Sequence, residues 1–273
     1  MAWGYNRGVL SAMPRLLSTD FDGTIYDPSE PEPVDLGLLA HFNTARADGA
    51  QWVINTGRHL EDVLEVLAAL NLGVAPDFIV SVERYIHRRN RRGFEEHAVW
   101  NRSCRRDHDA LFKQAEAGME RLRRRIADAM PATLSRDEWS PLAIIAKTPE
   151  DAEIIHRWAL EESENVENLC IVRNSHYFRF SHANYSKGTA LREIAGLLGL
   201  GPERVFAAGD HYNDLPMLEG VHARHVAAPS NAIREVKRVV RQAGGHVSRH
   251  RCGRGVLDAL QRLQNPSNSI RRK

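Results

Sequence analysis

Asp20 and Asp22 flank a phenylalanine, follow the short apolar run 16–19, and precede Gly23. Two carboxylates at the end of a buried strand cost free energy unless a cation or a ligand requires them there. One could attack phosphorus and form an aspartyl phosphate, while the other protonates the leaving oxygen and then activates water. The alternative interpretation is a turn with two solvated acids, because so short a motif also occurs by chance.

Three further polar clusters follow predicted strands or begin predicted helices. Thr56 and Gly57 offer a hydroxyl and a backbone N–H to phosphate oxygens, and Lys187 offers the same oxygens a positive charge. Asp210 is a hard oxygen ligand of the kind that Mg²⁺ prefers, and Asp214 could hold Lys187 or the metal's water shell. Each residue alone also fits a helix cap, a surface lysine or a loop acid. Their occurrence together favours a site.

Alternating strand and helix patterns would bring these clusters together. Apolar runs predict strands, and apolar residues at helical spacing predict the helices between them. The predicted strands are 16–19, 51–55, 78–82, 205–208 and 226–228, and the predicted helices are 34–47, 60–70, 188–198 and 231–242. In such α/β sheets, ligands bind at the carboxyl ends of the strands, which is where the four clusters lie.

The middle of the chain has a different pattern. We predict a hairpin over 85–100, a long helix over 105–130, and then a strand, a helix and two strands up to 180. Residues 83–136 contain fourteen basic and eight acidic residues, a local charge of +6. The fold class predicted is therefore α/β, with a Rossmann-like doubly wound parallel sheet core over 1–82 and 184–273 and an inserted α+β cap domain over 83–183.

Composition excludes several other classes of protein. Apolar residues make up 42% of the 273 residues, and the formal net charge is only +2, which does not mark a nucleic-acid binder. Three cysteines without a CxxC pair argue against a disulfide framework and a zinc site. No stretch has the roughly 20 apolar residues that span a bilayer, and the N-terminal segment lacks the apolar core of a signal peptide. We therefore expect a cytoplasmic protein without a membrane partner.

The ordered motifs resemble those of the haloacid dehalogenase-like hydrolase superfamily. They read Leu-Leu-Ser-Thr-Asp20-Phe-Asp22-Gly-Thr24, Asn55-Thr56-Gly57-Arg58, Ser186-Lys187-Gly188 and Gly209-Asp210-His-Tyr-Asn213-Asp214. The pair Asn231-Ala232 and the stretch 253–257 are similar to the Cof-type and sucrose-phosphate-phosphatase-like branch, in which a C2-type cap lies between the second and third motifs. His211 and Tyr212 depart from the usual pattern, in which a small residue follows the Gly-Asp pair.

The resemblance implies a magnesium-dependent phosphatase acting on a small phosphorylated metabolite, with a sugar or polyol phosphate favoured. It implies that Asp20 is the nucleophile and that Asp22 is the general acid and base. The remaining roles implied are phosphate binding by Thr56, Gly57 and Lys187, Mg²⁺ binding by Asp20, the backbone carbonyl of Asp22 and Asp210, and support by Thr24, Arg58, Asn213 and Asp214.

Three alternatives remain at this stage. A phosphotransferase or phosphomutase would share the nucleophile and differ only in its product. A dehalogenase is disfavoured because halide departure needs no acid at Asp22. A nucleic-acid-binding protein with a vestigial site is disfavoured by the complete set of motifs and by the lack of aromatic residues among the arginine runs. Specificity would belong to the cap, whose polar candidates are the arginines of 84–92, His87, Lys147, Arg173, Arg179 and His182.

The first prediction concerns the nucleophile. Asp20→Asn is expected to abolish phosphate release from an aryl phosphate, because an amide is a poor nucleophile. Circular dichroism should show that the variant is folded. Activity like that of the wild type in a folded sample would contradict the assignment.

Overall fold

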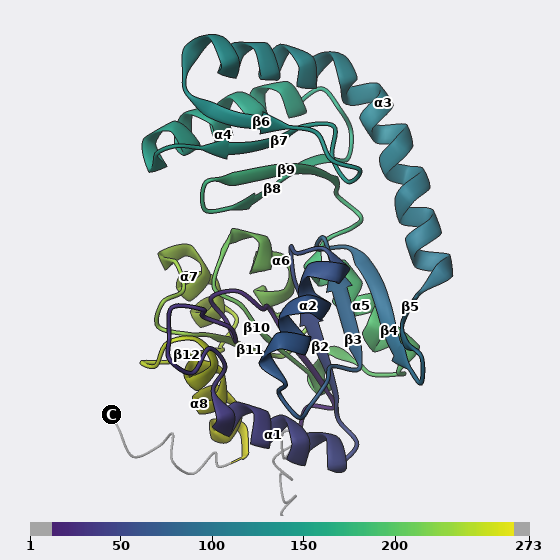
Figure 1. Ribbon diagram of the computed structural model, residues 1–273, viewed down its shortest axis with the longest axis vertical. Coiled ribbons are helices and arrows are strands. Elements are labelled where there is room, and N and C mark those ends of the chain that lie inside the picture. The colour runs from purple at the N-terminus through teal and green to yellow at the C-terminus, as the bar shows by residue number, and fades with distance from the viewer. Residues whose placement is uncertain (1–12, 265–273) are drawn as a thin grey trace, which may run out of the picture.

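The computed structural model describes residues 13–264, which form two β-sheets in two lobes (Figure 1). The strands of the larger sheet are β1 (Leu16–Thr19), β2 (Gln51–Asn55), β3 (Phe78–Ser81), β4 (Tyr85–Asn90), β5 (Gly93–Glu96), β10 (Val205–Ala208), β11 (His225–Ala228) and β12 (His246–Val247). Their order is β12-β11-β10-β1-β2-β3-β4-β5. The pairs from β12 to β3 are parallel, whereas β4 and β5 add an antiparallel edge.

Helices cover both faces of the larger sheet. Those on one face are α1 (Leu36–Ala47), α2 (Leu60–Leu70) and α8 (Cys252–Gln264), and those on the other are α5 (Lys187–Leu197), α6 (Leu215–Leu218) and α7 (Arg234–Gln242). Short 3₁₀ helices lie at Pro202–Arg204 and Tyr212–Asp214. Successive residues of a strand point to opposite faces, so Leu16 lies in one core and Leu17 in the other. The predicted α/β fold is confirmed.

The smaller lobe is an antiparallel sheet backed by two helices. Its strands, in the order β6-β7-β9-β8, are β6 (Ala132–Ser135), β7 (Ala143–Ala146), β9 (Tyr177–His182) and β8 (Leu169–Asn174), and its helices are α3 (Ala98–Ala129) and α4 (Pro149–Ser163). Phe178 and Phe180 are buried in the core beneath the helices. Tyr177, Arg179 and Ser181 alternate with them and therefore point to the opposite face, toward the larger lobe.

The hairpin predicted as part of the inserted unit is paired with the larger sheet. Strand β4 pairs with β3, and Ile86 packs in the core of the larger lobe. Helix α3 begins at Ala98, so residues 98–100 are helical and not part of the hairpin. The boundaries at 83 and 183 stay a prediction. The expectation for the N-terminal segment falls mainly on residues 1–12, outside the described residues. Within them, no helix combines the length and apolar character needed to cross a membrane.

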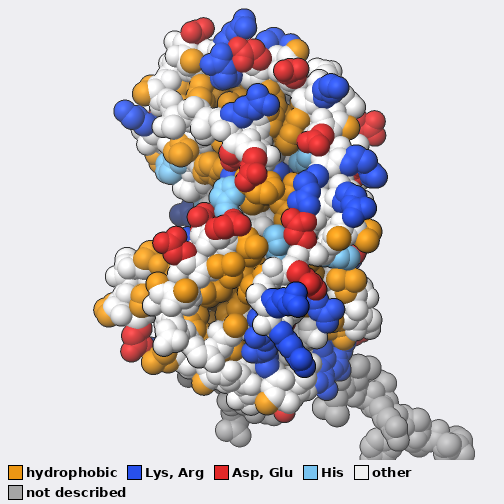
Figure 2. Space-filling model, turned by 45° about the vertical axis from the view of Figure 1, so that its right-hand side comes forward, with side chains coloured by type: hydrophobic (Ala, Val, Ile, Leu, Met, Phe, Trp, Pro, Cys, Tyr) orange, Lys and Arg blue, Asp and Glu red, His pale blue; other side chains and the backbone are white. Residues whose placement is uncertain are grey.

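Two seams join the lobes. Arg84, only 2% exposed, donates to the hydroxyl of Ser181 and to the carbonyl of Trp139. At the second seam, the backbone N–H of Ser175, in the turn between β8 and β9, donates to Nδ1 of His211 over 3.2 Å. Figure 2 shows a hollow between the lobes, with acidic and histidine side chains gathered along it. The smaller sheet thus faces the carboxyl ends of the parallel strands of the larger one.

Gly188, in the first turn of α5, allows a close approach on which the position of Lys187 depends. A Cβ atom at residue 188 would lie 2.2 Å from the backbone oxygen of Pro216. We expect Gly188→Ala to lower the free energy of unfolding by about 1–3 kcal/mol, because the backbone must shift to make room.

Gly196 on the same helix is the matched control for this prediction. No atom lies within 4 Å of the Cβ that Gly196→Ala would add, and alanine favours helix by up to about 1 kcal/mol. Thermal unfolding should therefore show a lower Tm for Gly188→Ala and an equal or higher Tm for Gly196→Ala. Equal values for the wild type and Gly188→Ala would contradict the packing argument.

Candidate active site

The parallel pairing of the central strands brings the predicted clusters to one edge of the larger sheet. Strand β1 lies between β2 and β10, so Asp20, Thr56 and Asp210 follow neighbouring strands. The backbone N–H of Asp20 donates to Ala208 over 2.9 Å, and that of Thr56 donates to Val80 over 2.9 Å. These bonds continue the sheet by one residue and fix where the side chains begin.

Lys187 lies at the centre of the site and is fully buried. It opens α5, whose N-terminus is fixed by reciprocal capping between Ser186 and Thr189. Its Nζ donates to Oδ1 of Asp20 and to Oδ1 of Asp214, each over 2.6 Å. Burial alone lowers the pKa of this ammonium, but the two carboxylates more than offset that effect and raise the pKa above its ordinary value. Lys187 therefore stays charged.

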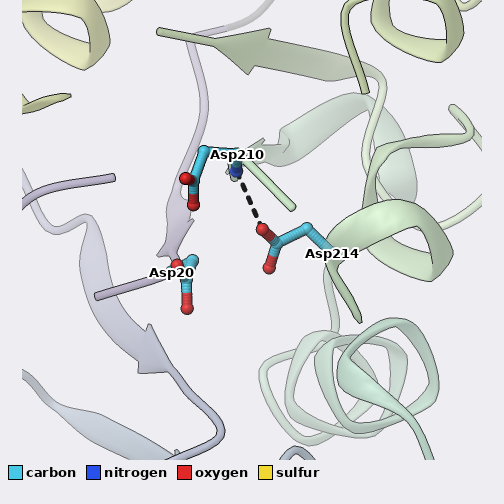
Figure 3. Close-up of side chains that lie close together, drawn as sticks. All are labelled: Asp20, Asp210 and Asp214. Carbon is cyan, nitrogen blue, oxygen red and sulfur yellow. Dashed lines mark hydrogen bonds between the residues drawn. The ribbon is translucent and has the colours of Figure 1, made fainter. Parts of the chain in front are cut away.

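Asp20, Asp210 and Asp214 bring three carboxylates together (Figure 3). One oxygen from each lies within 4.8 Å of the others. Burial, and then the charge of Asp214, raises the pKa of Asp20 well above its ordinary value, and the same two causes raise the pKa of Asp210 to about 7. Three carboxylates facing one lysine leave negative charge that a cation would neutralise.

The turn after β1 holds Asp20 beside Asp210. Gly23 has a φ of 72°, and a Cβ there would lie 2.5 Å from Oδ2 of Asp210. The hydroxyl of Thr24 lies 3.1 Å from Asp210 Oδ1 and 3.3 Å from Asp20 Oδ2. Nδ2 of Asn231 donates to the carbonyl of Gly23 over 2.7 Å. The pair Asn231-Ala232 resembled the family at sequence level, but this support of the turn was not predicted.

Asp214 accepts hydrogen bonds at both of its oxygens. Besides Lys187, it accepts from the backbone N–H groups of Asp210 and His211 over 2.8 and 2.9 Å. It thus fixes the loop that carries Asp210. His211 packs against the turn of the smaller lobe through its Nδ1, and burial lowers its pKa to about 4, so it is neutral near pH 7.

Asp22 lies apart from the other carboxylates. Arg58 holds it with two parallel hydrogen bonds of 2.7 and 2.6 Å, and the guanidinium lies 5.7 Å from the ring centres of both Phe21 and Tyr26. The Asp22 side chain is 42% exposed. Both residues were predicted to belong to the site, but their ion pair was not, because 36 positions separate them.

Glu83 is a residue of this site that was not predicted from the sequence. It is 8% exposed, accepts a hydrogen bond from Nδ2 of Asn213 over 2.9 Å, and would be 3.1 Å from a Cβ at Gly57. The signal was present, because Glu83 follows the third predicted strand as the other site residues follow theirs.

The polar candidates in the inserted segment divide into several groups. Arg179 is buried, ion-paired with Asp137 over 3.0 Å, and on the strand face that points toward the larger lobe. Arg173 lies over the ring of Tyr212 at 5.1 Å. His87 contacts Ser81 within the larger sheet. The basic run on α3 is paired with acids: Arg123 and Arg124 with Glu120, and Arg125 with Glu161.

The donor set fits a divalent cation. Mg²⁺ and Ca²⁺ take hard oxygen ligands, and the buried cluster offers carboxylates with a single lysine as counter-charge. Neither a thiol nor an imidazole belongs to this cluster, so soft-metal chemistry finds no ligands in it.

Comparisons with known proteins agree with this fold. The family model described as haloacid dehalogenase-like hydrolase matches residues 116–260, which is more than half of the chain. The chain therefore belongs to the haloacid dehalogenase-like hydrolases. A second family model, sucrose-6F-phosphate phosphohydrolase, matches residues 13–124. Within the family the chain is a phosphatase of the Cof-type and sucrose-phosphatase-like branch.

Some individual relatives extend the match to most of the chain. YxeH of Bacillus subtilis (strain 168), named as a candidate phosphatase, is 25% identical over 92% of this chain and 98% of its own length. A phosphoglycolate phosphatase of Methanococcoides burtonii is 30% identical over only 36% of this chain and 41% of its own. The sucrose-phosphatase structure from Synechocystis sp. PCC6803 has the same fold, with a TM-score of 0.68, 18% identity, and 92% and 99% of the two chains covered.

The carboxylate cluster predicts a link between cation binding and stability. In chelator, Asp210→Asn is expected to raise Tm by several °C, because it removes one of three crowded negative charges. Mg²⁺ should raise the Tm of the wild type, since a ligand present at a hundred times its Kd adds about 2.7 kcal/mol, and should raise that of the variant much less.

Asp128→Asn, on the exposed surface of α3, is the control for loss of one acid. Its response to Mg²⁺ should equal that of the wild type in the same thermal-shift series. An equal rise for the wild type and Asp210→Asn would show that the cation binds elsewhere.

Proposed function

We propose that this phosphatase hydrolyses a small phosphorylated metabolite, a sugar or polyol phosphate, in a Mg²⁺-dependent reaction through an aspartyl phosphate on Asp20. The observation that carries the proposal is the buried Asp20 carboxylate, which accepts from Lys187 over 2.6 Å and lies beside Asp210 at the carboxyl end of β1. Such a carboxylate is held in place, close to a cation, and within reach of a ligand at the sheet edge.

In the proposed first step, a carboxylate oxygen of Asp20 attacks phosphorus, and the bond from phosphorus to the ester oxygen breaks. The leaving oxygen takes a proton from Asp22 and departs as an alcohol. In the second step, Asp22 accepts a proton from water, which attacks phosphorus and releases inorganic phosphate and free Asp20. Lys187, the hydroxyl of Thr56 and the N–H of Gly57 would hold the phosphate oxygens, where transfer spreads negative charge.

Mg²⁺ would be held by Asp20, the backbone carbonyl of Asp22 and Asp210, and would offset the repulsion between Asp20 and an anionic substrate. Asp214 would keep the Asp210 loop in place, since it accepts from two backbone N–H groups of that loop. Asp22 accepts two hydrogen bonds from Arg58, so its proposed proton transfer requires its side chain to turn from Arg58 toward the leaving oxygen.

Two features support a small substrate over a polymer. The smaller sheet faces the site, and its β8–β9 turn contacts the loop after Asp210, so a substrate must fit between the two lobes. Each arginine of the basic run on α3 is ion-paired with Glu120 or Glu161, which weakens the case for nucleic acid. The phosphatase and sucrose-phosphatase names among the similar proteins point to phosphate monoesters as well.

The test is a panel of sugar phosphates, polyol phosphates, nucleotides, phosphopeptides and oligonucleotides with terminal phosphates. We expect the highest kcat/KM for a sugar or polyol phosphate, loss of activity in chelator, and recovery with Mg²⁺. Product analysis should find inorganic phosphate, which separates hydrolysis from transfer to a second alcohol. The substrate class is wrong if terminal phosphates on oligonucleotides are removed fastest, and full activity in chelator would reject the metal.

A further inference from the structure

The turn between β3 and β4 has a backbone that its residues adopt only at a cost. Val82 and Glu83 have φ values of 48° and 66°, and the N–H of Arg84 donates to Ser81 across them over 3.1 Å. β-Turns with positive φ at both central residues favour Asn-Gly, and a β-branched residue in this region is an outlier. Strain of this kind is found where a side chain serves a function.

The strained turn is fixed against the proposed phosphate-binding loop. The N–H of Val82 donates to the carbonyl of Arg58 over 2.9 Å, and that of Glu83 donates to the carbonyl of Thr56 over 2.8 Å. The Glu83 side chain is thereby placed over Gly57, between the loops that carry Thr56 and Asn213. The two backbone hydrogen bonds thus fix the point from which the Glu83 side chain extends.

The Glu83 carboxylate has one oxygen available to a ligand. Oε1 accepts from Asn213, whereas no hydrogen bond reaches Oε2 from residues 13–264. In the same part of the chain, no basic side chain lies within ion-pair distance of it, although the residue is 8% exposed. Burial raises the pKa of Tyr177, and Asp20 and Asp214 raise that of Lys187 against the effect of burial; the charge of Glu83 adds a smaller contribution to each. A carboxylate oxygen so placed can accept a hydrogen bond from a ligand that enters the site.

We propose that Glu83 determines specificity by accepting a hydrogen bond from a hydroxyl group of the leaving alcohol and by repelling leaving groups that carry a second negative charge. This inference rests on the proposed function, because it places the ester's phosphate on Thr56, Gly57 and Lys187. Substrates of sugar or polyol type offer a hydroxyl donor to Oε2 without a second charge, whereas esters whose leaving group bears a carboxylate bring a negative charge that Glu83 repels. Glu83 thereby selects neutral, hydroxylated phosphate esters.

The experiment uses the full chain with Mg²⁺ and a matched pair of esters. Glycerol 3-phosphate has a hydroxymethyl group where 3-phosphoglycerate has a carboxylate. In a second pair, glucose 6-phosphate has an aldehyde carbon where 6-phosphogluconate has a carboxylate. Glu83→Gln keeps the shape and an acceptor for Asn213 but removes the charge. We expect it to lower the ratio of kcat/KM for the neutral over the acidic ester at least about tenfold, since hydrogen bonds to charged groups are strong.

Glu83→Gly is the second variant, and it tests the strain directly. Glycine adopts positive φ without penalty, so this variant should have a higher Tm than the wild type and the same loss of selectivity. The controls are Asn71→Gly, an exposed residue with a φ of 44° at the end of α2, and Glu65→Gln on the exposed surface of that helix. Neither control should change the ratio.

The outcomes separate this inference from the function on which it rests. If the wild type hydrolyses these esters but neither Glu83 variant changes the ratio by more than about twofold, the inference is overturned and the phosphatase proposal stands. An equal fall in kcat/KM for both esters, with an unchanged ratio, also overturns it. That result is expected if Glu83 only holds Asn213 in place. If the wild type releases phosphate from none of the esters, both proposals fail.

Discussion

The buried ammonium of Lys187 is the interaction on which the rest of the site depends. It lies on α5, which follows the smaller lobe in sequence. It contacts Asp20, directly after β1, and Asp214, in the loop after β10. An ammonium without partners would be costly to bury, and so would either carboxylate. The ammonium is therefore held by both carboxylates and each carboxylate by the ammonium, so the loops that carry them are fixed together. The close contact at Gly188 places the helix end where this is possible.

Sequence patterns predicted the parts of the structure that depend on short-range regularities. The strands of the βαβ runs are apolar, the helices between them have regular spacing, and each motif follows a strand or begins a helix. These facts sufficed for the α/β fold and the convergence of Asp20, Thr56, Lys187 and Asp210. Missed elements have weak local signals: β12 has two residues, and α8 begins Cys252-Gly-Arg-Gly255.

Other features depend on pairing partners that no local pattern specifies. The sequence of the hairpin 85–96 does not specify whether it pairs with the smaller sheet or the larger one. In the folded chain it pairs with β3, and Ile86 is buried in the core of the larger lobe. The ion pair of Arg58 and Asp22 and the hydrogen bond of Glu83 with Asn213 each join distant loops. Long-range contacts of this kind follow from the assembled fold and not from spacing.

The contact between Ser175 and His211 has a thermodynamic consequence. The loop from Asp210 to Asp214 supplies two of the three carboxylates of the site, and between them His211 accepts a hydrogen bond from the N–H of Ser175 in the β8–β9 turn. One short segment is therefore in contact with both the carboxylates of the site and the smaller lobe. Cation binding and the position of the smaller lobe are therefore linked, and linkage is reciprocal. If a change in lobe position alters the affinity for a cation by some factor, binding of the cation alters the equilibrium between lobe positions by the same factor.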